Sequence, residues 1–309
     1  MIQTVTPGRL RPGDMVGVIS PSSPPRDAKR IMRGVSALIA EGYRVRLGWS
    51  VGAHDGYLAG SDTLRATDIM AMFEDTRIRA IFCTRGGYGA ARLLGKLDYD
   101  FIRAHPRILV GFSDITALSL ALYAKAGLPT FAGPMIAAEF AVGMEKTTAD
   151  ALWDMLHSRR KRRILPHCGA MGILREGKSE GVLLGGNLAV LCSLIGTPWL
   201  PDFRNATLFL EDVGESVYRL DRMLLQLRDS GLLGRVSGVL LGSFTGIPDD
   251  EFNREFLQVL KEYLLPLDVP VLTDIPFGHI PEKITLPFGC RVALDTTRKE
   301  IAVLEPTVR

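Results

Sequence analysis

The sequence predicts an α/β protein with two domains. The first is expected to be a doubly wound, mostly parallel, flavodoxin-like sheet, and the second a smaller mixed α/β domain. Two observations carry this prediction. In the first half, short apolar runs alternate with segments whose apolar residues recur at helical spacing, and strands separated by such helices pair in parallel. After a basic run at residues 159–163 the composition changes, and strand-like and helix-like segments follow in a mixed order.

The first half contains four pairs of elements. Strands are expected at 15–20, 43–48, 78–84 and 107–112, and helices at 28–39, 61–75, 90–97 and 114–127. Ser61 is expected to cap the second helix. Ligand sites in parallel sheets gather at loops beyond the carboxyl ends of strands. "RGGYG" (85–89) and "GFSD" (111–114) both occupy such positions.

The second half is expected to contain helices at Val217–Arg228 and at Glu251–Leu265, the latter stopped by Pro266. We expect an N-terminal domain at 1–150, a basic linker at 151–168 and a C-terminal domain at 169–309. The run "RRKRR" within the linker has two interpretations, an anion-binding patch or a solvated connection. The connection is favoured, because the run stands alone and no aromatic residues are interleaved with it.

Composition excludes several classes of protein. The 309 residues carry 37 basic and 34 acidic side chains, a net charge of +3 that gives no support for nucleic-acid binding. No apolar run reaches the roughly 20 residues of a membrane helix, and the first residues lack the pattern of a secretory signal. The four cysteines are single and widely spaced, so neither a zinc site nor a disulfide framework is indicated. We expect a cytoplasmic protein without metal or other cofactor.

Ser113 is the first candidate for chemistry. It follows a strand-like run, and Gly111 permits a tight turn before it. The following helix would aim its N-terminal N–H groups at the site. However, "GFSDI" matches only the first glycine of the G-x-S-x-G nucleophile elbow. The alternative is that Ser113 or Asp114 simply caps the helix.

Serine chemistry also needs a base, a group that orients the base, and donors for the oxyanion. Among the five histidines, His279 stands out because "PFGHIP" places it in a bend just past an apolar strand. Glu211 and Asp212 close the buried strand "TLFLED", and they face opposite sides of it, so only one of them is expected to serve the site.

The loop "TRGGYG" (84–89) is the fourth candidate. Gly86 and Gly87 let the backbone approach a ligand closely, and the Gly87 N–H could pair with the Asp114 N–H as oxyanion donors. A phosphate-binding loop is the weaker alternative, since neither nucleotide-loop motif is present. "LLGGN" (183–187) is interpreted as a helix start with Asn187 near its cap.

Taken in order, six motifs resemble the LD-carboxypeptidase family of serine peptidases, over residues 10 to 300. They are "YLAGSDTLRATDIMAMFED", "AIFCTRGGYGAARLL", "LVGFSDITAL", "LLGGNLAVLCSLIGTP", "LFLEDVGESVYRLDRML" and "DIPFGHIPEKITLPFG". The resemblance implies a Ser–Glu–His triad at Ser113, Glu211 and His279, with oxyanion donors at Gly87 and Asp114. It also implies a cytoplasmic homodimer without metal.

The activity implied by the resemblance is release of the terminal D-alanine from murein tetrapeptides, small peptide substrates. Arg85 is a candidate for binding the substrate carboxylate, beside Gly86. One alternative is a peptidase of the microcin C immunity type, which would need an aromatic platform for a nucleobase. Between 131 and 180 the only tryptophan is Trp153, in a helix-like run. A non-catalytic α/β binding protein is the alternative from another class.

Overall fold

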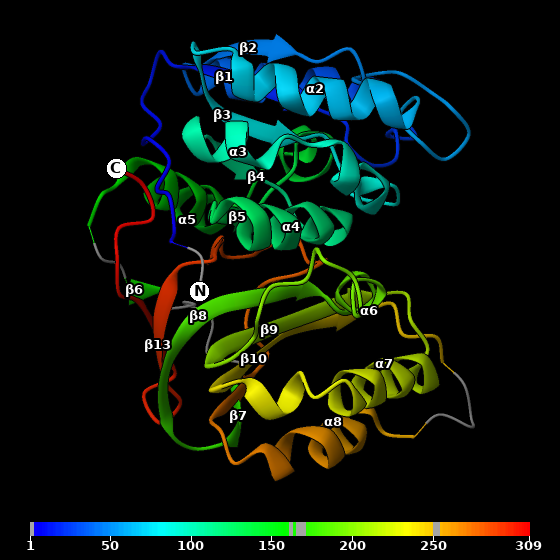
Figure 1. Ribbon diagram of the computed structural model, residues 1–309, viewed down its shortest axis with the longest axis vertical. Coiled ribbons are helices and arrows are strands. Elements are labelled where there is room, and N and C mark those ends of the chain that lie inside the picture. Colours follow the sequence, from blue (N-terminus) through cyan, green and yellow to red (C-terminus); the bar gives the residue numbers. More distant parts are fainter. Residues whose placement is uncertain (1–2, 161–162, 165–170, 250–253) are drawn as a thin grey trace.

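The computed structural model describes residues 3–160, 163–164, 171–249 and 254–309. It has two sheets, and Figure 1 shows them as separate layers, with α4 between the first sheet and strand β8 of the second. This is the expected two-domain α/β architecture.

The first sheet is doubly wound. Its strand order is β12-β5-β4-β3-β1-β2, and β2, β1, β3, β4 and β5 pair in parallel. The order 2-1-3-4-5 is flavodoxin-like, as the sequence predicts. The elements of this part of the chain are β1 (Met15–Ile19), α1 (Lys29–Ala40), β2 (Arg44–Leu47), α2 (Asp62–Glu74), β3 (Ile78–Cys83), η1 (Ala90–Lys96), α3 (Tyr99–Ala104), β4 (Ile108–Val110), η2 (Ser113–Ile115), α4 (Thr116–Ala126), β5 (Thr130–Ala132), η3 (Ile136–Phe140) and α5 (Lys146–His157).

Local sequence explains most of these elements. Helix α1 buries Ile31, Val35 and Leu38 on one face, the spacing of an amphipathic helix. Ser61 caps α2 as expected, and its side chain accepts a hydrogen bond from the Leu64 N–H at 3.2 Å. One element differs. The segment expected to be a helix at 90–97 forms the 3₁₀ helix η1, which begins after a left-handed glycine at position 89.

The second sheet is mixed, with the order β6-β14-β13-β8-β9-β10-β11-β7. Strands β8 to β11 are parallel, and the outer pairs are antiparallel. Its part of the chain contains β6 (Arg163–Ile164), β7 (Gly172–Arg175), β8 (Lys178–Asn187), α6 (Leu188–Ser193), β9 (Ala206–Val213), α7 (Val217–Asp229), η4 (Leu233–Arg235), β10 (Gly238–Thr245), α8 (Phe256–Leu264), η5 (Leu265–Leu267), β11 (Val271–Thr273), β12 (Leu286–Phe288), β13 (Arg291–Asp295) and β14 (Glu300–Val303).

The division of the chain differs in detail from the sequence expectation. Helix α5 runs across residue 150, and the expected linker at 151–168 therefore begins inside a helix; much of its remainder lies outside the described residues. Strand β12 comes from the C-terminal segment but pairs antiparallel with β5 in the first sheet. The helix expected at 251–265 is observed as α8, and 251–253 lie outside the described residues.

Candidate active site

Ser113 lies in a strained turn between β4 and α4. Its φ is +64°, a left-handed conformation that costs a non-glycine residue about 1–3 kcal/mol. Neither η2 nor α4 has a side-chain cap, so the alternative in which Ser113 or Asp114 caps the helix is wrong. The turn instead presents Ser113, which is half-buried, to a cleft. A nucleophile elbow has this geometry even though the sequence motif is incomplete.

The Asp114 carboxylate connects three loops rather than starting the helix. Its Oδ2 accepts hydrogen bonds from the Ser22 hydroxyl at 2.6 Å and from the Ala90 N–H at 2.8 Å. Burial raises the pKa of Asp114 above its ordinary value, although both hydrogen bonds and the nearby Arg65 lower it. Asp114 thus ties the turn of Ser113 to the loops after β1 and β3.

The glycine loop after β3 packs directly against Ser113. A Cβ atom at Gly86 would lie 2.8 Å from Ser113 Oγ and 3.2 Å from the Asp114 N atom. Gly87 has a φ of +113° that favours glycine. In the described part of the chain, neither the Gly87 N–H nor the Asp114 N–H donates to a protein acceptor. Two free amides therefore lie in the segments that flank Ser113, as an oxyanion site requires.

The second sheet brings an acid and an imidazole to the same cleft. Glu211 lies on β9 and is 2% exposed, and its Oε2 is 2.7 Å from His279 Nδ1. Because the carboxylate can only accept, Nδ1 carries the proton and Nε2 is left as the basic nitrogen. Gly278 makes this contact possible, since a Cβ there would lie 3.1 Å from Glu211 Oε2.

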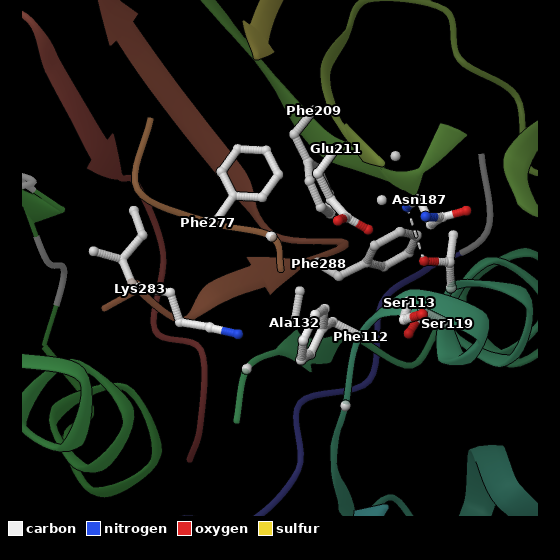
Figure 2. A pocket seen from close by; sticks show the side chains of 17 residues that line it. Phe112, Ser113, Ser119, Ala132, Asn187, Phe209, Glu211, Phe277, Lys283 and Phe288 are labelled. Carbon is white, nitrogen blue, oxygen red and sulfur yellow. Dashed lines mark hydrogen bonds between the residues drawn. The ribbon is translucent and has the colours of Figure 1, made fainter. Parts of the chain in front are cut away.

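The surroundings of Glu211 strengthen its effect on His279. Figure 2 shows the Glu211 carboxylate among the rings of Phe209, Phe277 and Phe288. Its second oxygen, Oε1, is buried and has no hydrogen-bond partner within the described residues. Within the described residues the carboxylate therefore accepts from the His279 ring alone, which fixes the orientation of the imidazole.

Asp212, the other acid of the pair, has a structural role. It accepts hydrogen bonds from the Asn187 side-chain amide at 3.0 Å and from the Ala189 N–H at 2.9 Å. Asn187 caps α6 by accepting from the Val190 N–H, as expected for "LLGGN". Only Glu211 of the pair thus reaches the site, in agreement with the alternation of side chains along a strand.

Three residues near the site were missed by sequence reasoning. Lys283 is 4% exposed, and its Nζ lies 2.5 Å from Glu139 Oε1 and 4.1 Å from the centre of the Phe112 ring. That ring in turn packs against the His279 ring at 5.0 Å between centroids. Lys283 follows His279 within "HIPEK", and a lysine in a proline-rich loop gives no sequence signal of burial.

A cleft of about 850 Å³ lies in front of these groups. Ser113, Gly86, Gly87, His279 and Arg85 all line it, so the structure brings these expected site residues together; Glu211 lies behind His279. The half-buried Arg85 is close to two further arginines of the cleft, Arg26 and Arg30. Burial lowers the pKa of Arg85, and the charges of these two neighbours lower it further. This edge of the cleft attracts anions.

Other kinds of site find no support among the described residues. No group of three or more His, Cys, Asp or Glu side chains there is arranged to hold a metal ion. The three described cysteines, at positions 83, 192 and 290, are free and buried. No described helix is long and apolar enough to cross a membrane. Trp153 packs in the core beside Tyr43, with 5.3 Å between ring centroids, and so offers no platform in the cleft.

A strained serine, free amides in the adjoining segments and a histidine held by a buried carboxylate form the arrangement of a serine-type hydrolase. Comparison with known proteins defines the family. Residues 16–133 match the LD-carboxypeptidase N-terminal domain, and residues 180–294 match the LD-carboxypeptidase C-terminal domain. The chain belongs to the LD-carboxypeptidase family of serine-type peptidases.

Three relatives illustrate the range of the family. A probable murein peptide carboxypeptidase of Bacillus subtilis is 37% identical over 98% of this chain and 95% of its own length. The microcin C7 self-immunity protein MccF of Escherichia coli is 31% identical over 96% and 94%, and MccF with glutamyl sulfamoyl guanosine has a TM-score of 0.92. A muramoyltetrapeptide carboxypeptidase from Oxalobacter formigenes has a TM-score of 0.82 at 31% identity, covering 94% of this chain and 97% of that one.

Proposed function

We propose that this protein hydrolyses the L,D amide bond of murein tetrapeptides and releases the terminal D-alanine. The observation that carries the proposal is the 2.7 Å contact between Glu211 and His279 in the cleft that Ser113 lines. The relative in Bacillus subtilis is named a probable murein peptide carboxypeptidase, which supports this substrate class.

In the proposed mechanism, Ser113 Oγ attacks the scissile carbonyl and His279 Nε2 takes its proton. Glu211 holds the ring through Nδ1 and stabilises the imidazolium that forms. The Gly87 and Asp114 N–H groups bind the oxyanion, each worth on the order of 10²–10³ in rate. His279 then protonates the leaving D-alanine, and water hydrolyses the acyl-enzyme.

A carboxypeptidase must also bind the free carboxylate of its substrate. Arg85 is the proposed partner, because a Cβ at Gly87 would lie 3.6 Å from Arg85 Nη2. The guanidinium is thus close to the proposed oxyanion donor. A planar guanidinium matches a carboxylate through two parallel hydrogen bonds. Arg26 and Arg30 add positive charge on the same edge of the cleft.

The test is mass spectrometry of a purified murein tetrapeptide before and after incubation. Wild-type enzyme should remove one alanine, and Ser113→Ala should remove none. Ser193→Ala, an exposed serine of α6, serves as the matched control and should match wild type. Undiminished release by Ser113→Ala would overturn the mechanism.

A parallel assay with a processed microcin C analogue separates the alternative substrate. Trp153 packs inward and therefore offers no exposed ring on which a nucleobase could stack. Turnover of the analogue alone would shift the function to the immunity type. The family resemblance also supports the proposal of a cytoplasmic homodimer. Light scattering during size-exclusion chromatography measures the mass of the protein in solution and so tests the dimer.

A further inference from the structure

A second pocket, lined by arginines, lies at the amino ends of the strands of the first sheet. The candidate active site lies at their carboxyl ends. Arg11 precedes β1, Arg79 lies at the start of β3, and Arg107 directly precedes β4. Ser113 follows the other end of β4, so the pocket and the active-site cleft are separated by the length of the strand. The volume of the pocket is about 520 Å³, within the range of small-molecule sites.

The charge of this pocket is strongly one-sided. Six arginines line it against a single acidic side chain, that of Asp14; the arginines are Arg9, Arg11, Arg79, Arg107, Arg159 and Arg309. Asp14 accepts the backbone N–H of Arg11 at 2.8 Å. Across the described parts of the chain, none of the six forms an ion pair, whereas Arg46 and Arg77 nearby share Asp75.

Two half-buried arginines of the pocket each have one guanidinium nitrogen without an acceptor, although Arg107 Nη1 donates to the Pro106 carbonyl at 3.3 Å. Arg9 Nε and Arg107 Nε are inaccessible to solvent, and neither has a hydrogen-bond partner among the described residues. Burial lowers the pKa of Arg107 and the charge of Arg79 lowers it further, whereas the charge of Asp75 raises it. Buried donors and crowded like charges both disfavour the free state, and a bound anion would relieve both.

The backbone around the pocket is well fixed. The Arg9 N–H donates to the main-chain oxygen of Arg309 at 2.8 Å, and the Arg309 N–H donates to the Pro7 carbonyl at 2.9 Å. These bonds join the two ends of the chain beside the sheet. Arg159 adds the first residue of the basic run "RRKRR" to the same pocket, so part of that run gathers with other arginines rather than standing alone.

We propose that this pocket binds a multiply charged phosphate compound, an oligophosphate either free or carried by a nucleotide. Guanidinium groups bind phosphate oxygens through paired, charge-assisted hydrogen bonds, and a hollow lined by six arginines suits several anionic oxygens better than a single carboxylate. The hollow shape and the net charge of +3 for the whole chain favour a small ligand over a nucleic-acid strand. The proposal is independent of the peptidase activity.

Isothermal titration calorimetry with sodium tripolyphosphate, in about 150 mM salt to screen surface charge, tests this site. Wild type should show saturable one-to-one binding. Arg79→Ala/Arg107→Ala should weaken it about 10- to 100-fold, since each lost contact is a charge-assisted hydrogen bond. The matched control Arg222→Ala/Arg298→Ala, which removes two exposed arginines elsewhere, should bind like wild type.

Retained D-alanine release and an unchanged circular dichroism spectrum would show that the pocket variant is folded. A titration with ATP distinguishes the two sources of the phosphate. Equal or tighter binding of ATP identifies a nucleotide-compatible site, and binding of tripolyphosphate alone identifies a free oligophosphate; both support the proposal. Absence of saturable heat in wild type, or equal weakening in the pocket and control variants, would overturn it.

Discussion

The two sheets contribute to the candidate active site in different ways. The first sheet contributes main-chain geometry, namely the left-handed Ser113 and the glycine loop packed against it. The second sheet contributes a pair of side chains, Glu211 and His279, joined by one hydrogen bond. The first contribution is therefore sensitive to any added atom near the backbone, and the second to a change of charge. Substitutions on each side should separate these sensitivities.

The largest effect is expected on the side of the second sheet. Glu211→Gln should lower kcat/KM for tetrapeptide about 10⁴-fold, because an amide stabilises the wrong tautomer of His279 and no imidazolium. Steady-state kinetics measures this. Glu215→Gln, which changes a partly exposed acid after the same strand, is the control and should retain activity. A loss under tenfold for Glu211→Gln would contradict the orienting role.

The next largest effect on activity is expected from a substitution in the glycine loop of the first sheet. Gly86→Ala places a Cβ 2.8 Å from Ser113 Oγ, so the nucleophile or the loop must shift. A displacement of this size at the reacting atoms should cost about 10²-fold in kcat. Gly234→Ala, where an added Cβ meets nothing within 4 Å, should behave as wild type. Equal activity of both variants would show that the loop does not position Ser113.

A smaller effect is expected from the cationic edge of the cleft. Arg85→Met should raise KM about tenfold or more with little change in kcat, since a charge-assisted contact to the substrate carboxylate is lost. The measurement compares a tetrapeptide acid with its C-terminal carboxamide. Wild type should strongly prefer the acid, and the variant should not. An undiminished preference would assign the carboxylate to another residue.

Sequence reasoning predicted the parallel order of the first sheet because helical and strand periods alternate clearly there. It also selected Ser113, Glu211 and His279, which the structure gathers at one cleft. It failed where long-range contacts decide. A helix cap was the alternative considered for Ser113 or Asp114, but the Asp114 side chain accepts from Ser22 and from the Ala90 N–H, which lie in two distant segments.

The burial of Lys283 was likewise invisible in sequence. Its partner Glu139 is 144 positions away, and the Phe112 ring beneath its ammonium group follows the distant strand β4. Strand β12 was not expected in the first sheet for the same reason, because its pairing with β5 joins distant segments. Local propensity carries no information on such contacts.

The smallest expected effect is on the stability that Asp114 gives to the fold by linking loops, and on how this stability depends on pH. Burial raises the pKa of this acid in the folded state, so the folded protein holds the proton at pH values where the unfolded chain, with a carboxyl pKa of about 3.9, has lost it. Stability from this group is therefore greatest at low pH and falls as pH rises through that window, by at most about 1.4 kcal/mol per pH unit.

Urea unfolding of wild type and Asp114→Asn measures this dependence, from about pH 3, below the ordinary carboxyl pKa, up to about pH 8. The difference in free energy of unfolding, wild type minus variant, should decrease with rising pH. Asp229→Asn, an exposed acid at the end of α7, should give a difference without this slope. A difference that increases with pH would mean that the ionised form of Asp114 is the one the fold stabilises.

The most direct measurement is labelling of the protein with a fluorophosphonate, followed by digestion and tandem mass spectrometry. The proposed nucleophile requires a single modified peptide, with the phosphonate on Ser113, and much slower labelling of His279→Ala because the base is gone. Modification of a different serine, or undiminished labelling of Ser113→Ala, would contradict the assignment of Ser113 as the nucleophile.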